Sequence, residues 1–306
     1  MAELVYAHDS KSCSARIVGS SPTSPTKPMT KIRRLLHISR PVFWPLMMAI
    51  YAAGVLYSSA SWESQTWLGL IYFSFPVCLI ILGLNDIADR ESDAQNARKG
   101  GVEGAVLKKS EVRYVIKWVV SLALLFPLIF IVWGYYQMAL SIIGTIVFAY
   151  AYSIKPIRFK SRPGFDSLSN GACALFSFLA GYSASFRGSV FQLPPSYYLL
   201  LFFLAPSAFH AFSTLVDYDT DKKVGDKTFA VYMGKRLTIF ICTVAFAICC
   251  IASVGHNPVT TVYFLTATLL VGSNLMWPSY RNIHHAAWGI LLAFPLAIIY
   301  FLAFGL

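Results

Sequence analysis

The chain has 306 residues, of which 57% are hydrophobic and only 13% are charged. A soluble globular domain usually carries about 25% charged residues, so this composition excludes an ordinary soluble protein. The formal net charge is +11, which anionic lipid headgroups or an anionic substrate balance without any nucleic acid partner.

The chain divides into a short polar segment and a long apolar one. Residues 1–30 are rich in Ser, Thr, Pro and Lys and lack an apolar core, so we expect a disordered cytosolic tail and not a cleaved signal peptide. Residues 31–306 contain apolar runs that are each long enough to span a bilayer. These runs cover about 41–58, 66–84, 113–133, 137–153, 168–186, 196–216, 237–254, 258–277 and 286–306. The sequence therefore predicts an all-α, polytopic membrane bundle of nine transmembrane helices.

The loops between these runs differ in charge. Lys and Arg cluster in the loops that follow the even-numbered runs, whereas the odd-numbered loops carry only Arg187. Positive residues favour the cytosolic side of a membrane, so we expect an integral, multi-pass protein with its N-terminus and a polar cap in the cytosol. The lipid bilayer is then a predicted partner, and the sequence carries no signal for an oligomeric state.

Acidic residues are scarce and clustered. Only 14 residues are Asp or Glu, and seven of them lie in the windows 85–93 and 217–221. Asp86, Asp89 and Asp93 are spaced i, i+3, i+7, so on a helix they share one face, and Asn85 adds a neutral oxygen beside them. Acidic residues at the mouth of a membrane bundle are candidates for function, because burying them without a partner is costly.

The second acidic window has the same character. Asp217 and Asp221 are spaced i, i+4, where like charges destabilise a helix unless something neutralises them. Mg²⁺ prefers such oxygen ligands and bridges carboxylates to substrate phosphates. We therefore expect metal ligands and catalytic groups in both windows, and the simpler alternative is a salt-bridged, solvated rim. The predicted metal ligands are Asn85, Asp86, Asp89, Asp93, Asp217 and Asp221, with Asp86, Asp89, Asp217 and Asp221 also predicted to be catalytic.

Basic and hydroxyl groups near these windows suit the oxygens of a diphosphate. For each basic residue a positive-inside anchor is the alternative. The candidates for diphosphate binding are Arg40, Lys99, Tyr152, Ser153, Lys155 and Arg158, with Lys160 and Arg162 also considered. His210 lies inside the sixth apolar run, where a hydrogen bond to a neighbouring helix is favoured over a place in a pocket.

These residues together resemble the UbiA superfamily of intramembrane prenyltransferases over roughly residues 31–306. The resemblance is carried by the N-D-x-x-D-x-x-x-D run at 85–93, the D-x-x-x-D-x-x-x-G-x-x-T run from Asp217 to Thr228, and the Tyr152-Ser153 pair. It implies a helical bundle that opens laterally to lipid, with a polar cap holding Mg²⁺ and the diphosphate of a prenyl substrate.

Two further runs, 96–104 and 160–171, resemble the lycopene-elongase branch, which UbiA-type terpene cyclases also resemble. The T-R-x-R-P-L-A type run of quinone-pathway members is absent, which disfavours an aromatic acceptor. We expect ionisation of a C15 or C20 allylic diphosphate, with the cation captured by an alkene of the same chain, as in a diterpene cyclase. The main alternative is transfer to a separate isoprenoid, carotenoid or aromatic acceptor, and a transporter is disfavoured because the carboxylates lie at one face.

Overall fold

The computed structural model describes residues 30–93, 105–188 and 192–304, and within these ranges every regular element is helical. The α helices are α1 (Lys31–Ile38), α2 (Trp44–Tyr57), α3 (Ser64–Tyr72), α4 (Phe75–Ala88), α5 (Arg90–Asp93), α6 (Lys109–Val132), α7 (Tyr136–Ser153), α8 (Phe165–Tyr182), α9 (Ser196–Ser213), α10 (Tyr218–Val224), α11 (Phe229–Met233), α12 (Lys235–Ser253), α13 (Pro258–Ser273) and α14 (Tyr280–Phe304). Short 3₁₀ turns are η1 (Pro41–Phe43), η2 (Phe159–Ser161), η3 (Ser183–Ser185) and η4 (Thr214–Val216). The predicted all-α class is confirmed. The predicted tail, apart from Thr30, and the run 96–104 with Lys99 lie outside the described residues.

The predicted apolar runs all overlap helices, but not all of these helices are full membrane spans. Among the described residues, five helical segments suit a bilayer crossing by length and composition, and a sixth is formed if the bent pair Lys31–Ile38 and Pro41–Tyr57 counts as one. Ser64–Ala88 is one of these five segments despite the break between α3 and α4, whereas α7 and α8 are not among them and α13 has only 16 residues. Several long apolar helices make this a multi-pass membrane protein, whereas the count of nine transmembrane helices stays a prediction.

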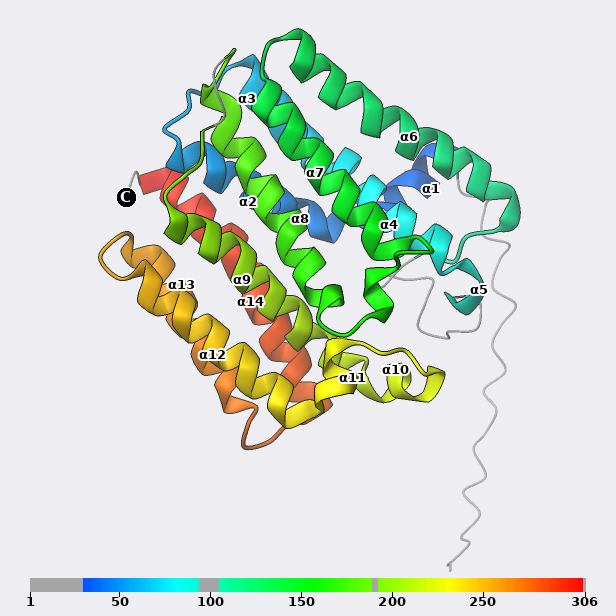
Figure 1. Ribbon diagram of the computed structural model, residues 1–306, viewed down its shortest axis with the longest axis vertical. Coiled ribbons are helices and arrows are strands. Elements are labelled where there is room, and N and C mark those ends of the chain that lie inside the picture. The colour runs from blue at the N-terminus through cyan, green and yellow to red at the C-terminus, as the bar shows by residue number, and fades with distance from the viewer. Residues whose placement is uncertain (1–29, 94–104, 189–191, 305–306) are drawn as a thin grey trace, which may run out of the picture.

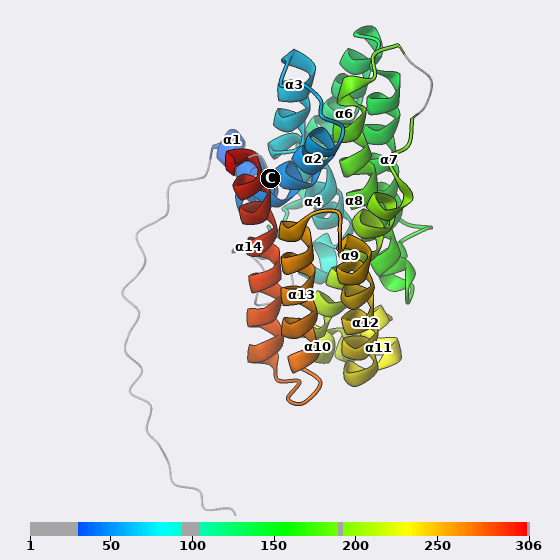
Figure 2. The ribbon, with the colours of Figure 1, turned by 90° about the vertical axis from the view of Figure 1, so that its left-hand side faces the viewer.

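The long helices lie side by side in one bundle (Figures 1 and 2). Successive contacts run from α4 through α6, α7, α8, α9, α12 and α13 to α14, and α14 packs on α2. Helix α2 also packs on α8, so these two helices stand between the N-terminal and C-terminal halves. Two clusters of buried apolar side chains fill the halves, and α2 and α8 contribute to both.

Helices α2 and α8 approach each other through glycine. A Cβ atom on Gly54 would lie 2.1 Å from the carbonyl oxygen of Phe178, and one on Gly181 would lie 2.0 Å from that of Tyr51. Small residues at helix interfaces let backbones approach closely, which is how helices associate where lipid removes the usual hydrophobic drive. This contact holds the two halves of the bundle together.

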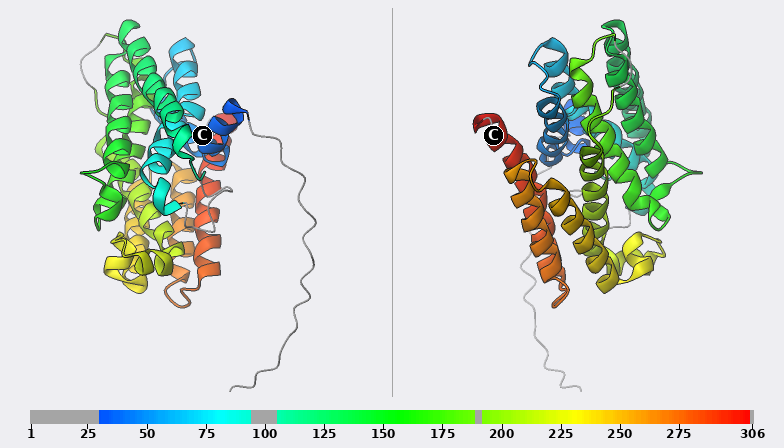
Figure 3. Two further views of the ribbon diagram at one scale, coloured as in Figure 1. Left: turned by 90° about the vertical axis from the view of Figure 1, so that its right-hand side faces the viewer. Right: turned by 60° about the vertical axis from the view of Figure 1, so that its left-hand side comes forward.

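The polar connections gather at one end of the bundle. The α7–α8 connection lies beside the α10–α11 segment in every view (Figures 1 to 3). Helix α11 contacts α8 and α9, and α5 follows directly on α4. Both acidic windows are therefore carried to this end by long apolar helices, as the predicted polar cap requires.

Candidate functional site

The first acidic window lies where α4 ends. Asp89 is the C-terminal capping residue of α4 and α5 begins at Arg90, so the window is a helix with a break and not one continuous helix. Helix-like hydrogen bonds cross the break, from Asp89 N to Asn85 O and from Asp93 N to Asp89 O. Asp86, Asp89 and Asp93 are all buried, with 0%, 7% and 6% of their surface exposed. The predicted shared face therefore exists, and it points inward.

Basic side chains from distant segments meet these buried carboxylates. Arg40 Nη2 lies 2.5 Å from Asp86 Oδ1, and Arg158 Nη2 lies 3.2 Å from Asp89 Oδ1. Lys160 Nζ also pairs with Asp89. A buried charge is costly unless it is paired, and here each of these two carboxylates has a guanidinium beside it. The cluster therefore combines oxygens that suit a metal with cations that suit a phosphate.

Arg40 and Arg158 share an unusual backbone. Their φ angles are 48° and 41°, in the left-handed region, and each residue precedes a short 3₁₀ turn. A residue other than glycine costs about 1–3 kcal/mol in such a conformation, and such residues concentrate at ligand sites. Both arginines that pair with the acidic cluster therefore hold strained positions, a feature that sequence patterns do not reveal.

The second acidic window forms a separate short helix. Asp217 precedes α10, and Asp221 N donates to Asp217 O at 2.9 Å, so the two residues lie one helical turn apart. Both are half-buried. Asp219 is 76% exposed at its side chain and pairs with Lys235. Asp219 thus faces away from the shared face of Asp217 and Asp221, as the spacing predicts.

Tyr152 connects the two windows. Its hydroxyl has Asn170 as a hydrogen-bond partner and lies within electrostatic range of Asp166, of Asp89 in the first window and of Asp221 in the second. Tyr152 is half-buried near the end of α7, and the next residue, Ser153, is buried with no hydrogen-bond partner for Oγ among the described residues. The predicted hydroxyl pair therefore lies at the polar end, with one member beside the carboxylates.

Asp166 is a polar residue that the motifs did not single out. It is fully buried in the first turn of α8, and its Oδ2 accepts a hydrogen bond from Phe229 N at 2.9 Å. This contact ties the start of α8 to the start of α11, the segment that follows Asp217 and Asp221. Its only signal in the sequence is a carboxylate at the start of an apolar run, where no partner is visible.

The remaining predicted binding residues are less central. Lys155 and Arg162 are exposed, and Arg162 donates to the carbonyl of Pro156. Lys99 lies outside the described residues. His210 hydrogen-bonds to residues of neighbouring helices, as the favoured expectation held.

The donor chemistry of the carboxylates fits Mg²⁺. Within the described ranges, no three His, Cys, Asp or Glu side chains come close enough to hold one ion by themselves. Mg²⁺ bound with a phosphorylated substrate uses one or two carboxylates per ion and takes other ligands from phosphate and water. The two acidic windows are therefore suited to hold Mg²⁺ together with a diphosphate. The residues concerned are Asp86, Asp89, Asp217 and Asp221, with Asn85 and Asp93 beside them.

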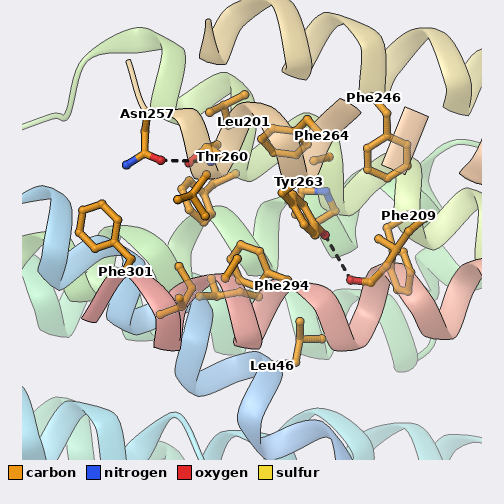
Figure 4. A pocket seen from close by; sticks show the side chains of 18 of the residues that line it. Leu46, Leu201, Phe209, Phe246, Asn257, Thr260, Tyr263, Phe264, Phe294 and Phe301 are labelled. Atoms are coloured by element: carbon orange, nitrogen blue, oxygen red, sulfur yellow. Dashed lines mark hydrogen bonds between the residues drawn. The ribbon is translucent and has the colours of Figure 1, made fainter. Parts of the chain in front are cut away.

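An apolar pocket lies among the helices of the C-terminal half of the bundle and α2. It is bordered by α2, α9, α12, α13 and α14, and its walls are rich in Phe and Tyr. Phe209 and Phe246 lie toward one end, and Asn257 and Phe301 lie toward the other (Figure 4). Phe209 lies eight residues before Asp217 in the sequence, on the helical segment that leads to the second acidic window. An aromatic pocket of this kind suits a hydrocarbon chain and stabilises a cation within it.

Comparison with protein families decides the family. Residues 42–294 match the UbiA prenyltransferase family. The chain belongs to this family. Among curated UbiA relatives, the lycopene elongase/hydratase of Corynebacterium glutamicum is 28% identical over 251 residues, covering 81% of this chain and 86% of the relative. The protein of the same name from Haloarcula japonica is 30% identical over 218 residues, covering 70% and 71%.

Solved structures agree with the UbiA fold. A UbiA homolog from Archaeoglobus fulgidus superposes with a TM-score of 0.68 at 22% identity, covering 88% of this chain and 98% of that one. The same homolog bound to GPP and Mg²⁺ gives a TM-score of 0.67 at 22% identity, covering 87% and 99%. The resemblance to the UbiA superfamily and its lycopene-elongase branch is thereby confirmed.

Proposed function

We propose that this protein is a Mg²⁺-dependent prenyltransferase that joins the prenyl group of an allylic diphosphate to an alkene of a separate isoprenoid, of the carotenoid type. The relatives carry this proposal: besides the two lycopene elongases, a C(50) β-cyclic carotenoid biosynthesis protein of Dietzia is 30% identical over 234 residues, covering 74% of this chain and 51% of that protein. They favour transfer between two molecules over the cyclase that the sequence alone favoured. None of these relatives is named as a cyclase, so transfer is proposed in its place.

The polar cap would bind the diphosphate. Carboxylates of the first acidic window form ion pairs with Arg40, Arg158 and Lys160. With substrate present, these cations would turn to the diphosphate oxygens, since charge-assisted hydrogen bonds to phosphate are strong. Mg²⁺ would neutralise the charge that develops on the leaving diphosphate. The residues that would hold it are Asp86, Asp89, Asp217 and Asp221, with Asn85 and Asp93 beside them.

The reaction breaks one bond and forms another. The allylic C–O bond breaks, and its electron pair leaves with the diphosphate. The π electrons of the acceptor alkene then form a new C–C bond to the allylic carbon, and the resulting cation loses a proton or takes up water. The aromatic wall of the pocket, including Phe209 and Phe246, would stabilise the cationic species and exclude bulk water before capture.

The prenyl donor is proposed only as an allylic diphosphate. The UbiA homolog from Archaeoglobus fulgidus has been solved bound to GPP and Mg²⁺ and bound to DMAPP and Mg²⁺. The C15 or C20 length expected from the sequence stays a prediction, as does the cytosolic side of the polar cap. The positive charge of the loops after the even-numbered runs supports that orientation.

Purified protein provides the test. Diphosphate release from DMAPP, GPP or geranylgeranyl diphosphate should require both Mg²⁺ and an added carotenoid such as lycopene. EDTA should stop the release, and excess Mg²⁺ should restore it. Release that needs no acceptor and yields a cyclic terpene would contradict the proposal and restore the cyclase.

A further inference from the structure

His210 bridges two hydroxyl groups at the polar end of the bundle. Its Nε2 lies 3.2 Å from the Tyr152 hydroxyl, and its Nδ1 lies 3.3 Å from Ser167 Oγ. The rings of His210 and Tyr152 are perpendicular, with centroids 5.8 Å apart. Both imidazole nitrogens are thus engaged, and one side chain joins α7, α8 and α9.

The bridge has neighbours that belong to the apolar pocket and to the acidic windows. Phe209, the residue before His210, lines the pocket. Tyr152, on the other side of the bridge, feels the charges of Asp89 and Asp221, one from each window. Tyr152 and Ser167 also flank the connection that carries Arg158 and Lys160 to Asp89. His210 therefore contacts a tyrosine whose hydroxyl lies within electrostatic range of both windows that are proposed to bind Mg²⁺ and the diphosphate.

A neutral imidazole has one donor nitrogen and one acceptor nitrogen, and its partners decide which is which. If Ser167 donates to Nδ1, then Nε2–H donates to the oxygen of Tyr152, and the phenolic hydrogen points to an acceptor other than His210. The opposite arrangement directs that hydrogen at His210. Only the first arrangement leaves Tyr152 able to donate to a group other than His210, and chains of hydrogen bonds strengthen one another.

We propose that His210 is a positioning residue, which receives a hydrogen bond from Ser167 and donates one to Tyr152, so that the Tyr152 hydroxyl donates to an oxygen of the prenyl diphosphate. This inference rests on the proposed function, because it assigns the tyrosine to the same substrate. A histidine that only joins three helices would stabilise the fold and leave the action of Tyr152 unchanged.

A double-mutant cycle separates these two roles, since coupling measures whether one residue acts through another. The variants are Tyr152→Phe, His210→Phe and the double variant, with diphosphate release from GPP, Mg²⁺ and lycopene as the readout. A hydrogen bond to a charged group contributes enough to predict a loss of about tenfold to hundredfold in kcat for each single variant. In the Tyr152→Phe background, His210→Phe should then lower kcat by less than about twofold.

Two amide replacements of His210 sharpen the test. The amide nitrogen of Gln lies near the position of Nε2, whereas that of Asn lies near Nδ1. His210→Gln should therefore keep more activity than His210→Asn, because only the former reaches Tyr152. Ser177→Ala, which removes a buried α8 hydroxyl that donates to Cys173 of its own helix, serves as the control for packing.

The outcomes are distinct. The inference is overturned if His210→Phe lowers kcat by the same factor in the wild-type and Tyr152→Phe backgrounds. It is also overturned if His210→Gln and His210→Asn have equal activity and lowered thermal stability. Either result would indicate a purely structural role. If wild-type protein releases no diphosphate with any donor and acceptor, the proposed function fails instead. The same cycle, measured on the affinity for GPP with Mg²⁺, then decides the inference: coupling supports it, and additive effects or a lack of binding overturn it.

Discussion

Arg40 and Asp86 are 46 residues apart in the sequence, and their side chains form an ion pair in which Nη2 and Oδ1 are 2.5 Å apart. The Asp86 side chain is fully buried, and only 10% of the Arg40 side chain is exposed. Arg40 lies just before the segment that leads into α2, and α2 also contributes Leu46 and Ile50 to the apolar pocket. The pair therefore fixes the first acidic window relative to the pocket.

Removing Arg40 should destabilise the protein. Arg40→Met leaves the buried Asp86 carboxylate without its guanidinium, which costs about 3–5 kcal/mol when a buried pair is broken on one side. We expect a lower midpoint of thermal inactivation in detergent with EDTA present, and partial recovery in the Arg40→Met, Asp86→Asn double variant. An unchanged midpoint for Arg40→Met would show that the pair has no role in stability.

Neutralising the acidic windows should stop the reaction. Asp86→Asn and Asp217→Asn each remove the charge of a proposed metal ligand, and we expect diphosphate release to fall by at least about 100-fold. Asp219→Asn is the matched control, because this side chain lies in the same window but is 76% exposed. Wild-type activity of all three variants under saturating Mg²⁺ would contradict the proposed metal site.

The contact between α2 and α8 should tolerate no larger side chain. Gly54→Ala and Gly181→Ala would each force the backbones apart, and overpacking of this kind costs about 1–3 kcal/mol or more. Gly289→Ala in α14 is the control, because its added Cβ meets nothing nearer than 3.6 Å. The first two variants should lose thermal stability, and the control should match or exceed wild type. A stable Gly181→Ala variant would contradict the close approach.

Thiol labelling tests the orientation of the protein in the membrane. In a Cys13→Ser background, the variants Lys222→Cys and Glu63→Cys should react with a membrane-impermeant thiol reagent from opposite sides of the membrane. Lys222 is expected on the cytosolic side, because basic loops stay there. The other native cysteines lie within helices and are buried or half-buried, so their background is low. Labelling of both positions from one side would contradict the topology.

The sequence predicted what depends on local pattern. Apolar runs predicted the helices, and the spacings of Asp86, Asp89 and Asp93 predicted a shared face, because side-chain periodicity along a helix is fixed. The pairing of Arg158 and Lys160 with Asp89 joins residues 69 and 71 positions apart. Such contacts follow from packing of whole helices and leave no local signal.

Other features were hidden for related reasons. The left-handed backbone of Arg40 runs against the usual preference of residues other than glycine, so no propensity argument would have found it. The contact of Asp166 with Phe229 N depends on how α11 folds back on α8. The choice between cyclase and transferase was also beyond the motifs, because both reactions begin with the same ionisation and differ only in which alkene captures the cation.

The most direct test of the central claim is the mass of the product. Purified protein with Mg²⁺, a ¹³C-labelled prenyl diphosphate and lycopene should yield a labelled carotenoid that is heavier than lycopene by one or more prenyl units, with one diphosphate released per unit added. The Asp86→Asn variant should yield none. A labelled cyclic hydrocarbon or alcohol formed equally well without lycopene, with the carotenoid left unlabelled, would contradict transfer to a separate isoprenoid.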